Sequence, residues 1–245
     1  SGNGVILKGG SEANYTNLAL VDALKDGLKS SEINHDSIAI LTSREDSMAM
    51  LDLDEIINLI IPRGSNELVK FIQENTKIPV LGHADGICHI YIDEEIDMDL
   101  AIKVSLDSKL QYPAACNSIE TLLIHKKIAE EFLKKAIPIF SSNEIQLRGD
   151  KRAQSYGVQL PANEKDWSTE YLDKILAIKI VDSLDNAIMH IQEFGSKHTD
   201  GIITKNSKHA IKFMNLVDSS GVFHNCSTRF ADGFRYGFGA EVGIS

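Results

Sequence analysis

The segment ILAIKIVDSLDNAIMHIQEFGSKHTDGIIT, residues 175–204, decides the fold class. It begins with an apolar run, Ile175–Val181, that predicts a buried strand, and ends with a shorter run, Gly201–Thr204, that predicts another. Between them, Ser183 and Gly195 bracket an apolar-periodic stretch and predict a helix over Leu184–Phe194. A strand, a helix and a strand in this order are typical of parallel α/β architecture.

The same alternation continues through the rest of the chain. Further strands are expected over Val5–Leu7, Ile38–Leu41, Ile56–Ile61, Ile78–Leu81, His89–Ile92, Ile119–Ile124 and Gly221–Asn225. Further helices are expected over Asn14–Leu28, Glu67–Glu74, Asp97–Leu110, Ile128–Ile137 and after a cap at Ser207. The polar segment 141–170 has no clear pattern. Because one α/β set gives way to the next near residues 82–93, we expect two α/β domains, residues 1–84 and 85–245.

Composition limits the class of protein. The 245 residues are 43% hydrophobic and 24% charged, which is ordinary for a soluble globular protein. The net charge of -10 argues against a nucleic-acid partner and against an anionic membrane surface, since both need a basic face. No apolar run reaches the length that a bilayer crossing requires, so we expect no membrane partner.

Three cysteines, Cys88, Cys116 and Cys226, lie far apart and form no CxxC pair. An odd number in a chain of this length does not indicate a disulfide framework, and the spacing that zinc ligands need is missing. We therefore expect no metal and a reducing compartment. The cytoplasm is the default, and an organellar version stays open.

Cys116 is the candidate nucleophile. It lies between a helix that Pro113 ends and the strand that begins near Ile119, among small residues that a substrate could approach. A thiolate there could form a covalent thioester, and the backbone amide could face a developing oxyanion. From spacing alone, however, a small buried thiol without chemistry is the favoured interpretation.

Two strand-to-helix junctions carry glycine and could receive phosphate. Gly9-Gly10-Ser11-Glu12 follows the first strand, and Arg63-Gly64-Ser65 precedes a helix. Free amides at a helix N-terminus favour phosphate, and Arg63 adds positive charge. Neither junction is a GxGxxG fingerprint, and a plain tight turn is the favoured interpretation of the first one.

Two other groups of polar residues have a functional and a structural interpretation. Arg229 follows a predicted buried strand and could hold a carboxylate through two parallel hydrogen bonds, or form a surface ion pair. His83 and His89 lack a third metal ligand, so buried, hydrogen-bonded imidazoles are favoured there.

Five blocks of sequence carry a resemblance to a known family. They are VILKGGSEA (residues 5–13), IIPRGS (60–65), GHADGICH (82–89), YPAACN (112–117) and NCSTRFADG (225–233). In this order, and across nearly the whole chain, they resemble the gamma-glutamyl phosphate reductase family of the aldehyde dehydrogenase superfamily. The resemblance implies an aldehyde-dehydrogenase-like α/β fold of two domains with parallel-rich sheets and a cleft between them. It also implies an NADP-dependent glutamate-5-semialdehyde dehydrogenase of proline biosynthesis.

The resemblance also implies roles for residues of this chain. Cys116 would attack the carbonyl of L-glutamyl 5-phosphate, with Asn117 beside it, and hydride from NADPH would release the semialdehyde. The expected cofactor contacts are Lys8, Gly10, Ser11, Glu12, Arg63, Gly64, Ser65 and Glu170. The expected substrate contacts are His83, Asn225, Ser227, Thr228 and Arg229. A glutamate kinase, as a partner or fused domain, and a homo-oligomer at full length are expected partners.

Two departures from the wider superfamily are informative. Oxidising members carry a glutamate that activates water, and the corresponding residues 80–83 (VLGH) contain no carboxylate, which favours a reductase. The chain begins at the strand Val5–Lys8. We therefore expect residues 1–84 to be only part of the NADP-binding domain, with its N-terminal part missing. A hydrolytic NAD(P)-dependent aldehyde dehydrogenase and a non-catalytic fragment of the reductase stay open as alternatives.

Overall fold

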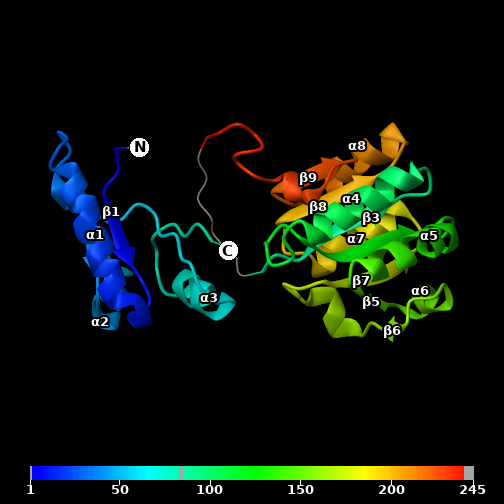
Figure 1. Ribbon diagram of the computed structural model, residues 1–245, viewed down its shortest axis with the longest axis horizontal. Helices are drawn as coiled ribbons and strands as arrows, with labels where there is room; N and C mark the ends of the chain where they lie inside the picture. Colours follow the sequence, from blue (N-terminus) through cyan, green and yellow to red (C-terminus); the bar gives the residue numbers. More distant parts are fainter. Residues whose placement is uncertain (1, 83–84, 240–245) are drawn as a thin grey trace. The chain divides into compact units, whose positions relative to one another are not determined.

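The chain forms two compact units, residues 1–82 and 83–245 (Figure 1). The computed structural model describes residues 2–82 and 85–239. Both units contain parallel strands joined by helices, as the alternation of the sequence predicted. The cleft expected between the two domains stays a prediction.

The first unit is built around a small parallel sheet. β1 (Val5–Lys8) pairs with β2 (Ile38–Leu41), and α1 (Asn14–Leu28) connects them on the predicted residues. Two further helices follow, α2 (Arg44–Met50) and α3 (Asn66–Glu74). The largest buried cluster of this unit is small, with Leu51, Ile60 and Ile78 and a few partly buried neighbours, while Val21 and Val69 are buried outside it.

The strand expected over residues 56–61 is wrong. Only Ile60 pairs, in an isolated parallel bridge with Val80, and residues 53–57 form a turn in which Ile57 N–H donates to the Leu53 carbonyl. Ile56 is 72% exposed, so an apolar run here does not mark a buried strand. Prolines at 62 and 79 lack the N–H groups that a longer ladder would need, which confines the pairing to one bridge.

The second unit contains a seven-stranded sheet whose strands are all parallel, in the order β6-β5-β7-β4-β3-β8-β9. Its strands are β3 (Cys88–Ile92), β4 (Ile119–His125), β5 (Gln146–Gly149), β6 (Leu160–Pro161), β7 (Ile175–Val181), β8 (Thr199–Ile203) and β9 (Gly221–His224). Every residue of β3, β4 and β8 is buried, as expected for parallel strands covered on both faces.

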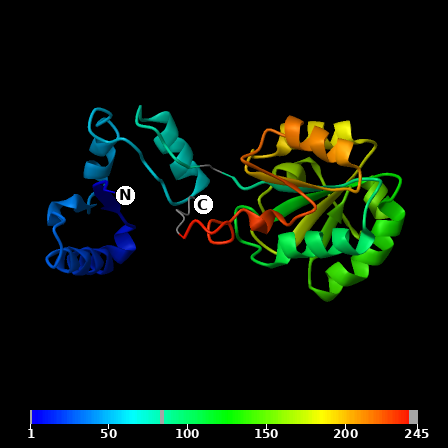
Figure 2. The same ribbon diagram turned by 90° about the horizontal axis from the view of Figure 1, so that it is seen from above.

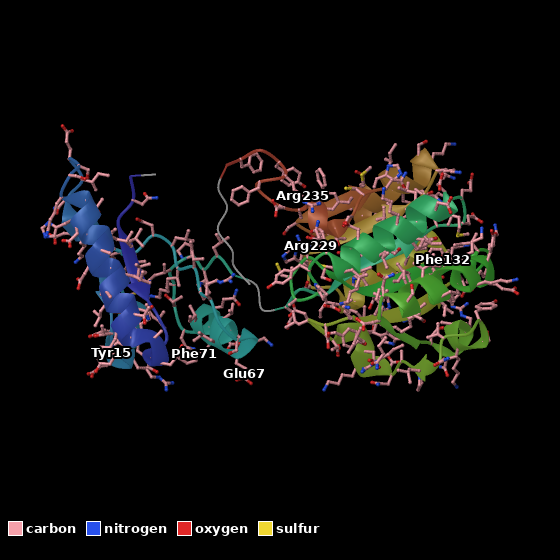
Figure 3. The ribbon with its side chains drawn as sticks, in the orientation of Figure 1. Tyr15, Glu67, Phe71, Phe132, Arg229 and Arg235 are labelled. Carbon is pink, nitrogen blue, oxygen red and sulfur yellow. The ribbon has the colours of Figure 1, made fainter. Side chains whose placement is uncertain are left out.

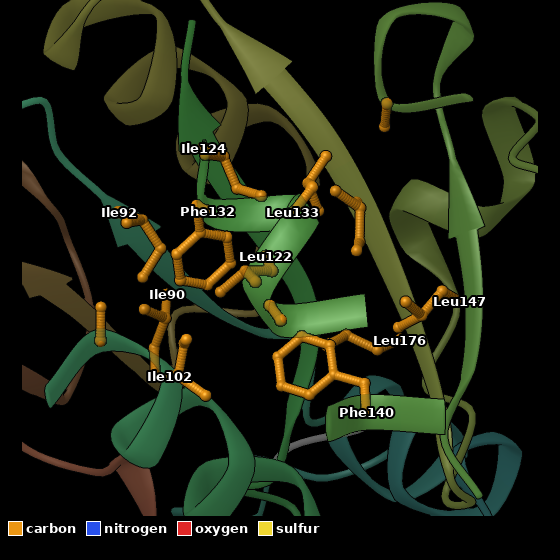
Figure 4. Packing of buried hydrophobic residues seen from close by; sticks show 14 of the residues in the cluster. Ile90, Ile92, Ile102, Leu122, Ile124, Phe132, Leu133, Phe140, Leu147 and Leu176 are labelled. Carbon is orange, nitrogen blue, oxygen red and sulfur yellow. The ribbon is translucent and has the colours of Figure 1, made fainter. Parts of the chain in front are cut away.

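Helices cover both faces of this sheet (Figure 2). One face carries α4 (Met98–Leu110), α5 (Ala129–Ser142) and α6 (Lys151–Ser155), and the other carries α7 (Leu184–Phe194) and α8 (Ser207–Leu216). Ile90 and Leu122 join the first core, shown with Phe132 in Figure 4, whereas their neighbours Tyr91 and Leu123 join the second. Successive side chains of a strand therefore supply two separate cores.

Three details of this unit differ from the prediction. α5 continues through Pro138 to Ser142, because Phe140 beyond the proline is fully buried and its burial offsets the lost hydrogen bond. α8 is capped by the side chain of Asn206, which accepts from Lys208 and His209 amides, and not by Ser207. Residues 141–170 are ordered as β5, α6, β6 and the 3-10 helix Glu164–Ser168.

Within residues 2–82 and 85–239, no helix combines the length and the apolar character that crossing a membrane requires.

Candidate active site

Cys116 lies in the turn between α4 and β4. Backbone hydrogen bonds shape this turn, from Ala115 N–H to the Tyr112 carbonyl at 3.1 Å and from Ser118 N–H to the Ala115 carbonyl at 2.9 Å. Cys116 is partly exposed, whereas the strand that follows it is buried throughout. The turn before a buried central strand therefore holds a partly exposed cysteine.

Gly86 brings the turn of Cys116 together with Glu170. A Cβ atom added to Gly86 would lie 2.3 Å from the Cys116 carbonyl oxygen and 2.6 Å from Glu170 Oε1. Because β3, β4 and β7 are parallel, the segments before them reach the same edge of the sheet. The structure thus places the predicted nucleophile and a predicted cofactor residue against one glycine that sequence reasoning did not single out.

Cys88, the first residue of β3, contacts the backbone of the Cys116 turn. Its sulfur donates a hydrogen bond to the Cys116 carbonyl at 3.2 Å, and the residue is fully buried. Burial, with a further contribution from Asp200, raises the pKa of the Cys88 thiol well above its usual range. A thiol is a poor nucleophile, so Cys88 is a packing residue.

Asn117 and Arg229 join two segments beside Cys116. The Arg229 Nη1 group donates to Asn117 Oδ1, and Arg229 Nε donates to Gln111 Oε1 at 3.1 Å. Asn117 Nδ2 in turn donates to the Ala231 carbonyl at 2.8 Å. Asn117 is therefore a residue that positions Arg229, which is labelled in Figure 3, next to the nucleophile.

Ser227 and Thr228 anchor the segment that carries Arg229. Ser108 Oγ donates to Ser227 Oγ at 3.0 Å, and Thr228 N–H donates to Ser108 Oγ at 3.2 Å. Thr228 is fully buried, and within the described residues its hydroxyl oxygen has no hydrogen-bond partner. Their substrate contacts stay predictions.

Asn225 holds the loop after β9. It adopts a left-handed backbone conformation, with φ of 54°, and both ends of its side-chain amide bond to the Thr204 backbone, at 2.9 Å and 3.0 Å. The amide is thus used within the protein, and its expected contact with a substrate stays a prediction. His83 lies outside the described residues.

A buried ion pair near Cys116 was missed in the sequence. Lys109 Nζ at the end of α4 lies 2.7 Å from Glu120 Oε2 on β4, and both side chains are almost completely buried. Burial raises the pKa of Glu120 to about 7 and lowers the pKa of Lys109. The signal was a charged residue inside an apolar strand pattern, where an unpaired charge would be costly.

The predicted cofactor residues of the first unit lie at two helix starts. Gly10, Ser11 and Glu12 are exposed after β1, where Lys8 Nζ bonds to the Gly9 carbonyl. Among the residues that the structure describes, no side chain caps the 3-10 helix Ser11–Ala13 or α1 behind it. Amide donors at this end are therefore not consumed by a side-chain cap, which fits a phosphate group.

The second junction is partly capped. Arg63, Gly64 and Ser65 are exposed, and the Ser65 hydroxyl accepts from Leu68 N–H at 3.4 Å at the start of α3. Sequence reasoning placed this cap correctly.

In residues 2–82 and 85–239, no cluster of three or more histidine, cysteine or acidic side chains could hold a metal ion.

Comparison with known proteins places this geometry in a family. The aldehyde dehydrogenase family model matches residues 1–174. The chain is 72% identical over 245 residues to a gamma-glutamyl phosphate reductase from Prochlorococcus marinus strain MIT 9515, covering 100% of this chain and 56% of that protein. This chain therefore spans little more than half the length of that relative.

Solved structures agree. The crystal structure of gamma-glutamyl phosphate reductase from Thermotoga maritima superposes with a TM-score of 0.96 at 41% identity, covering 100% of this chain and 60% of that one. A glyceraldehyde-3-phosphate dehydrogenase from Methanocaldococcus jannaschii shares the fold, with a TM-score of 0.72 at 15% identity over 94% of this chain and 60% of that one. The resemblance carried by the five sequence blocks is thus confirmed, and the chain belongs to the aldehyde dehydrogenase family, among relatives named gamma-glutamyl phosphate reductase.

Proposed function

We propose that this chain carries the catalytic site of an NADPH-dependent reductase that converts L-glutamyl 5-phosphate into L-glutamate 5-semialdehyde and phosphate. The observation that carries the proposal is the partly exposed Cys116 in the turn before β4, with Glu170 and Arg229 held beside that turn. The names of its relatives support the substrate, since they are reductases of gamma-glutamyl phosphate.

Cys116 forms and releases the covalent intermediate. Its thiolate attacks the acyl carbon, the C–O bond to phosphate breaks, and phosphate leaves with the electron pair to give a thioester. The backbone N–H of Cys116 itself would stabilise the oxyanion of the tetrahedral intermediate. Hydride that the bound cofactor supplies would add to the thioester carbon, and the Cys116 thiolate would leave as the aldehyde forms.

The proposed contacts for the cofactor, which supplies that hydride when it is bound, are the two glycine-bearing junctions and Glu170. Gly10, Ser11 and Glu12 would receive a phosphate at the uncapped start of α1, with Lys8 alongside. Arg63, Gly64 and Ser65 would bind at the second junction, where the guanidinium suits a phosphate oxygen. Glu170 would accept hydrogen bonds from ribose hydroxyl groups.

Arg229 is the proposed contact for the amino-acid end of the substrate. Its guanidinium is held by Gln111 and Asn117, and a guanidinium binds a carboxylate through two parallel hydrogen bonds. In the wider proposal the reaction belongs to proline biosynthesis in the cytoplasm. A glutamate kinase would supply the acyl phosphate, and the full-length protein would form homo-oligomers.

A cysteine exchange tests the nucleophile. We expect Cys116→Ala to abolish two signals, NADPH oxidation with glutamyl 5-phosphate made in situ by a glutamate kinase, and an acyl adduct found by mass spectrometry after incubation with the acyl phosphate alone. The adduct needs no cofactor, so it tests the thioester separately from hydride transfer.

Cys226→Ala is the matched control, because Cys226, like Cys116, is a partly exposed cysteine. It should keep both signals, and circular dichroism should show that both variants fold. Turnover at the wild-type rate in Cys116→Ala would refute the proposal.

A further inference from the structure

The Lys109–Glu120 ion pair is almost completely buried, and a contribution to the stability of the fold does not by itself explain why two charges lie there. The two charges are 2.7 Å apart with side chains 0% and 1% exposed. Removing two charges from water is costly, and apolar residues of similar volume often replace such a pair without loss of stability. A pair in this position is therefore a candidate for a role other than holding the fold together.

The pair contacts the segment that carries Glu170. Glu120 Oε1 accepts a hydrogen bond from Leu172 N–H at 3.5 Å, while its other oxygen binds Lys109. Burial lowers the pKa of Lys109 and raises that of Glu120; the charge of Asp173 opposes the first shift and the charge of Glu170 adds to the second, so both carboxylates lie near the pair. Leu172 has a φ of 55°, a left-handed conformation that a leucine adopts only when its surroundings hold it there.

The same two residues belong to the segments on either side of the Cys116 turn. Lys109 lies in the last turn of α4, where its carbonyl accepts from Ser118 Oγ at 3.4 Å, and Glu120 is the second residue of β4. One ion pair thus connects the two ends of the nucleophile turn to the segment of Glu170. No sequence motif discussed above includes either residue.

We propose that Lys109 and Glu120 are positioning residues that fix Glu170 relative to Cys116. The pair holds the amide of Leu172, and through it the carboxylate of Glu170, against Gly86 and the Cys116 backbone. The catalytic part of this inference rests on the proposed function. Its structural part, that the pair fixes the segment of Glu170 against the Cys116 turn, does not.

The test replaces the whole pair. A single change would leave one buried charge alone and could unfold the protein, so the variant is Lys109→Met with Glu120→Leu. We expect a thermal midpoint at or above that of the wild type, with a kcat lowered roughly 100-fold and an unchanged KM for the acyl phosphate, because misplacement by about 1 Å costs this much in rate.

Two readouts do not depend on turnover. Hydrogen exchange of the Leu172 amide should become faster in the variant, and the rate at which iodoacetamide alkylates Cys116 should change, with Cys226 as the internal reference. As a matched control, Lys197→Gln with Asp218→Asn removes an exposed pair 2.7 Å apart and should change none of these values.

The outcomes are distinguishable. If the wild type shows no reductase activity, the proposed function fails, and the exchange and alkylation rates still decide on the pair. If the folded double variant keeps the wild-type exchange rate at Leu172 and the wild-type alkylation rate at Cys116, the positioning role is refuted.

Discussion

At the scale of single residues, a glycine, which has no side chain, allows close contacts in the candidate site. Gly86 is buried, and its Cα faces the Cys116 carbonyl and the Glu170 carboxylate at distances that leave no space for a methyl group. The obstacle includes backbone of a turn that hydrogen bonds already hold, so it cannot move as the end of a flexible side chain would.

Gly86→Ala should therefore displace the Cys116 turn. We expect the free energy of unfolding to fall by about 1–3 kcal/mol, the range for overpacking a filled interior, and the alkylation rate of Cys116 to change. Urea denaturation and mass spectrometry measure these. Gly201→Ala is the control, since its added methyl would meet Ile90 Cγ1 at 3.4 Å, an ordinary contact. Equal stability of the two variants would contradict the argument.

At the scale of helices and strands, periodic and well-capped elements were predictable from sequence. β7 and α7 begin and end where the pattern of residues 175–204 placed them, with Ser183 capping and Gly195 ending the helix. The elements of residues 141–170 are only two to five residues long, too short to display a period. The strand predicted over residues 56–61 was wrong because an apolar run alone does not show whether a neighbouring strand is available for pairing.

The candidate site was predictable to a similar degree. Cys116 and Arg229 were candidates from their residue type and position, and Asn117 and Glu170 came from a resemblance; the structure gathers them around one turn. The contacts of Gly86 with Cys116 and Glu170 join residues far apart in the chain, which local patterns cannot show. Glu120 inside an apolar strand pattern was a signal of a buried charge, but its contacts with Lys109 and Leu172 belong to the folded state.

The packing of α7 on the sheet makes stability depend on pH. Burial, with the nearby His89 and Lys179, lowers the pKa of His190 on α7 to about 2. Its Nδ1 lies 3.0 Å from Lys179 Nζ, which can only donate, so the folded state needs the neutral imidazole. The unfolded chain binds a proton at about pH 6.5, so it binds more protons than the folded chain between pH 6.5 and 2.

Stability should therefore be fully present above pH 6.5 and be lost as the pH falls, by up to about 1.4 kcal/mol per pH unit from this group. Urea denaturation at pH 7 and pH 5 measures the loss. In His190→Gln, which keeps an acceptor for Lys179, the difference between the two pH values should shrink by roughly 2 kcal/mol at most. An unchanged difference would show that other groups cause the pH dependence.

At the scale of the whole molecule, the two units have unequal cores. The second unit buries two clusters on opposite faces of a seven-stranded sheet, and its central strands are completely covered. The first has one small cluster and a two-stranded sheet in which Val5, Ile6 and Leu7 are between 37% and 48% exposed. A pair of strands with so little covered surface is only marginally stable.

Hydrogen exchange should consequently separate the units within the intact chain. Amides of β3, β4 and β7 should exchange only through global unfolding of their unit, whereas those of β1 and β2 should exchange through local opening and at least roughly 100-fold faster, a difference of about 2.7 kcal/mol in opening free energy. Mass spectrometry of pepsin fragments resolves both regions. Comparable protection in β1 and β4 would mean that neither the burial of apolar side chains nor the number of strands governs local stability in the first unit.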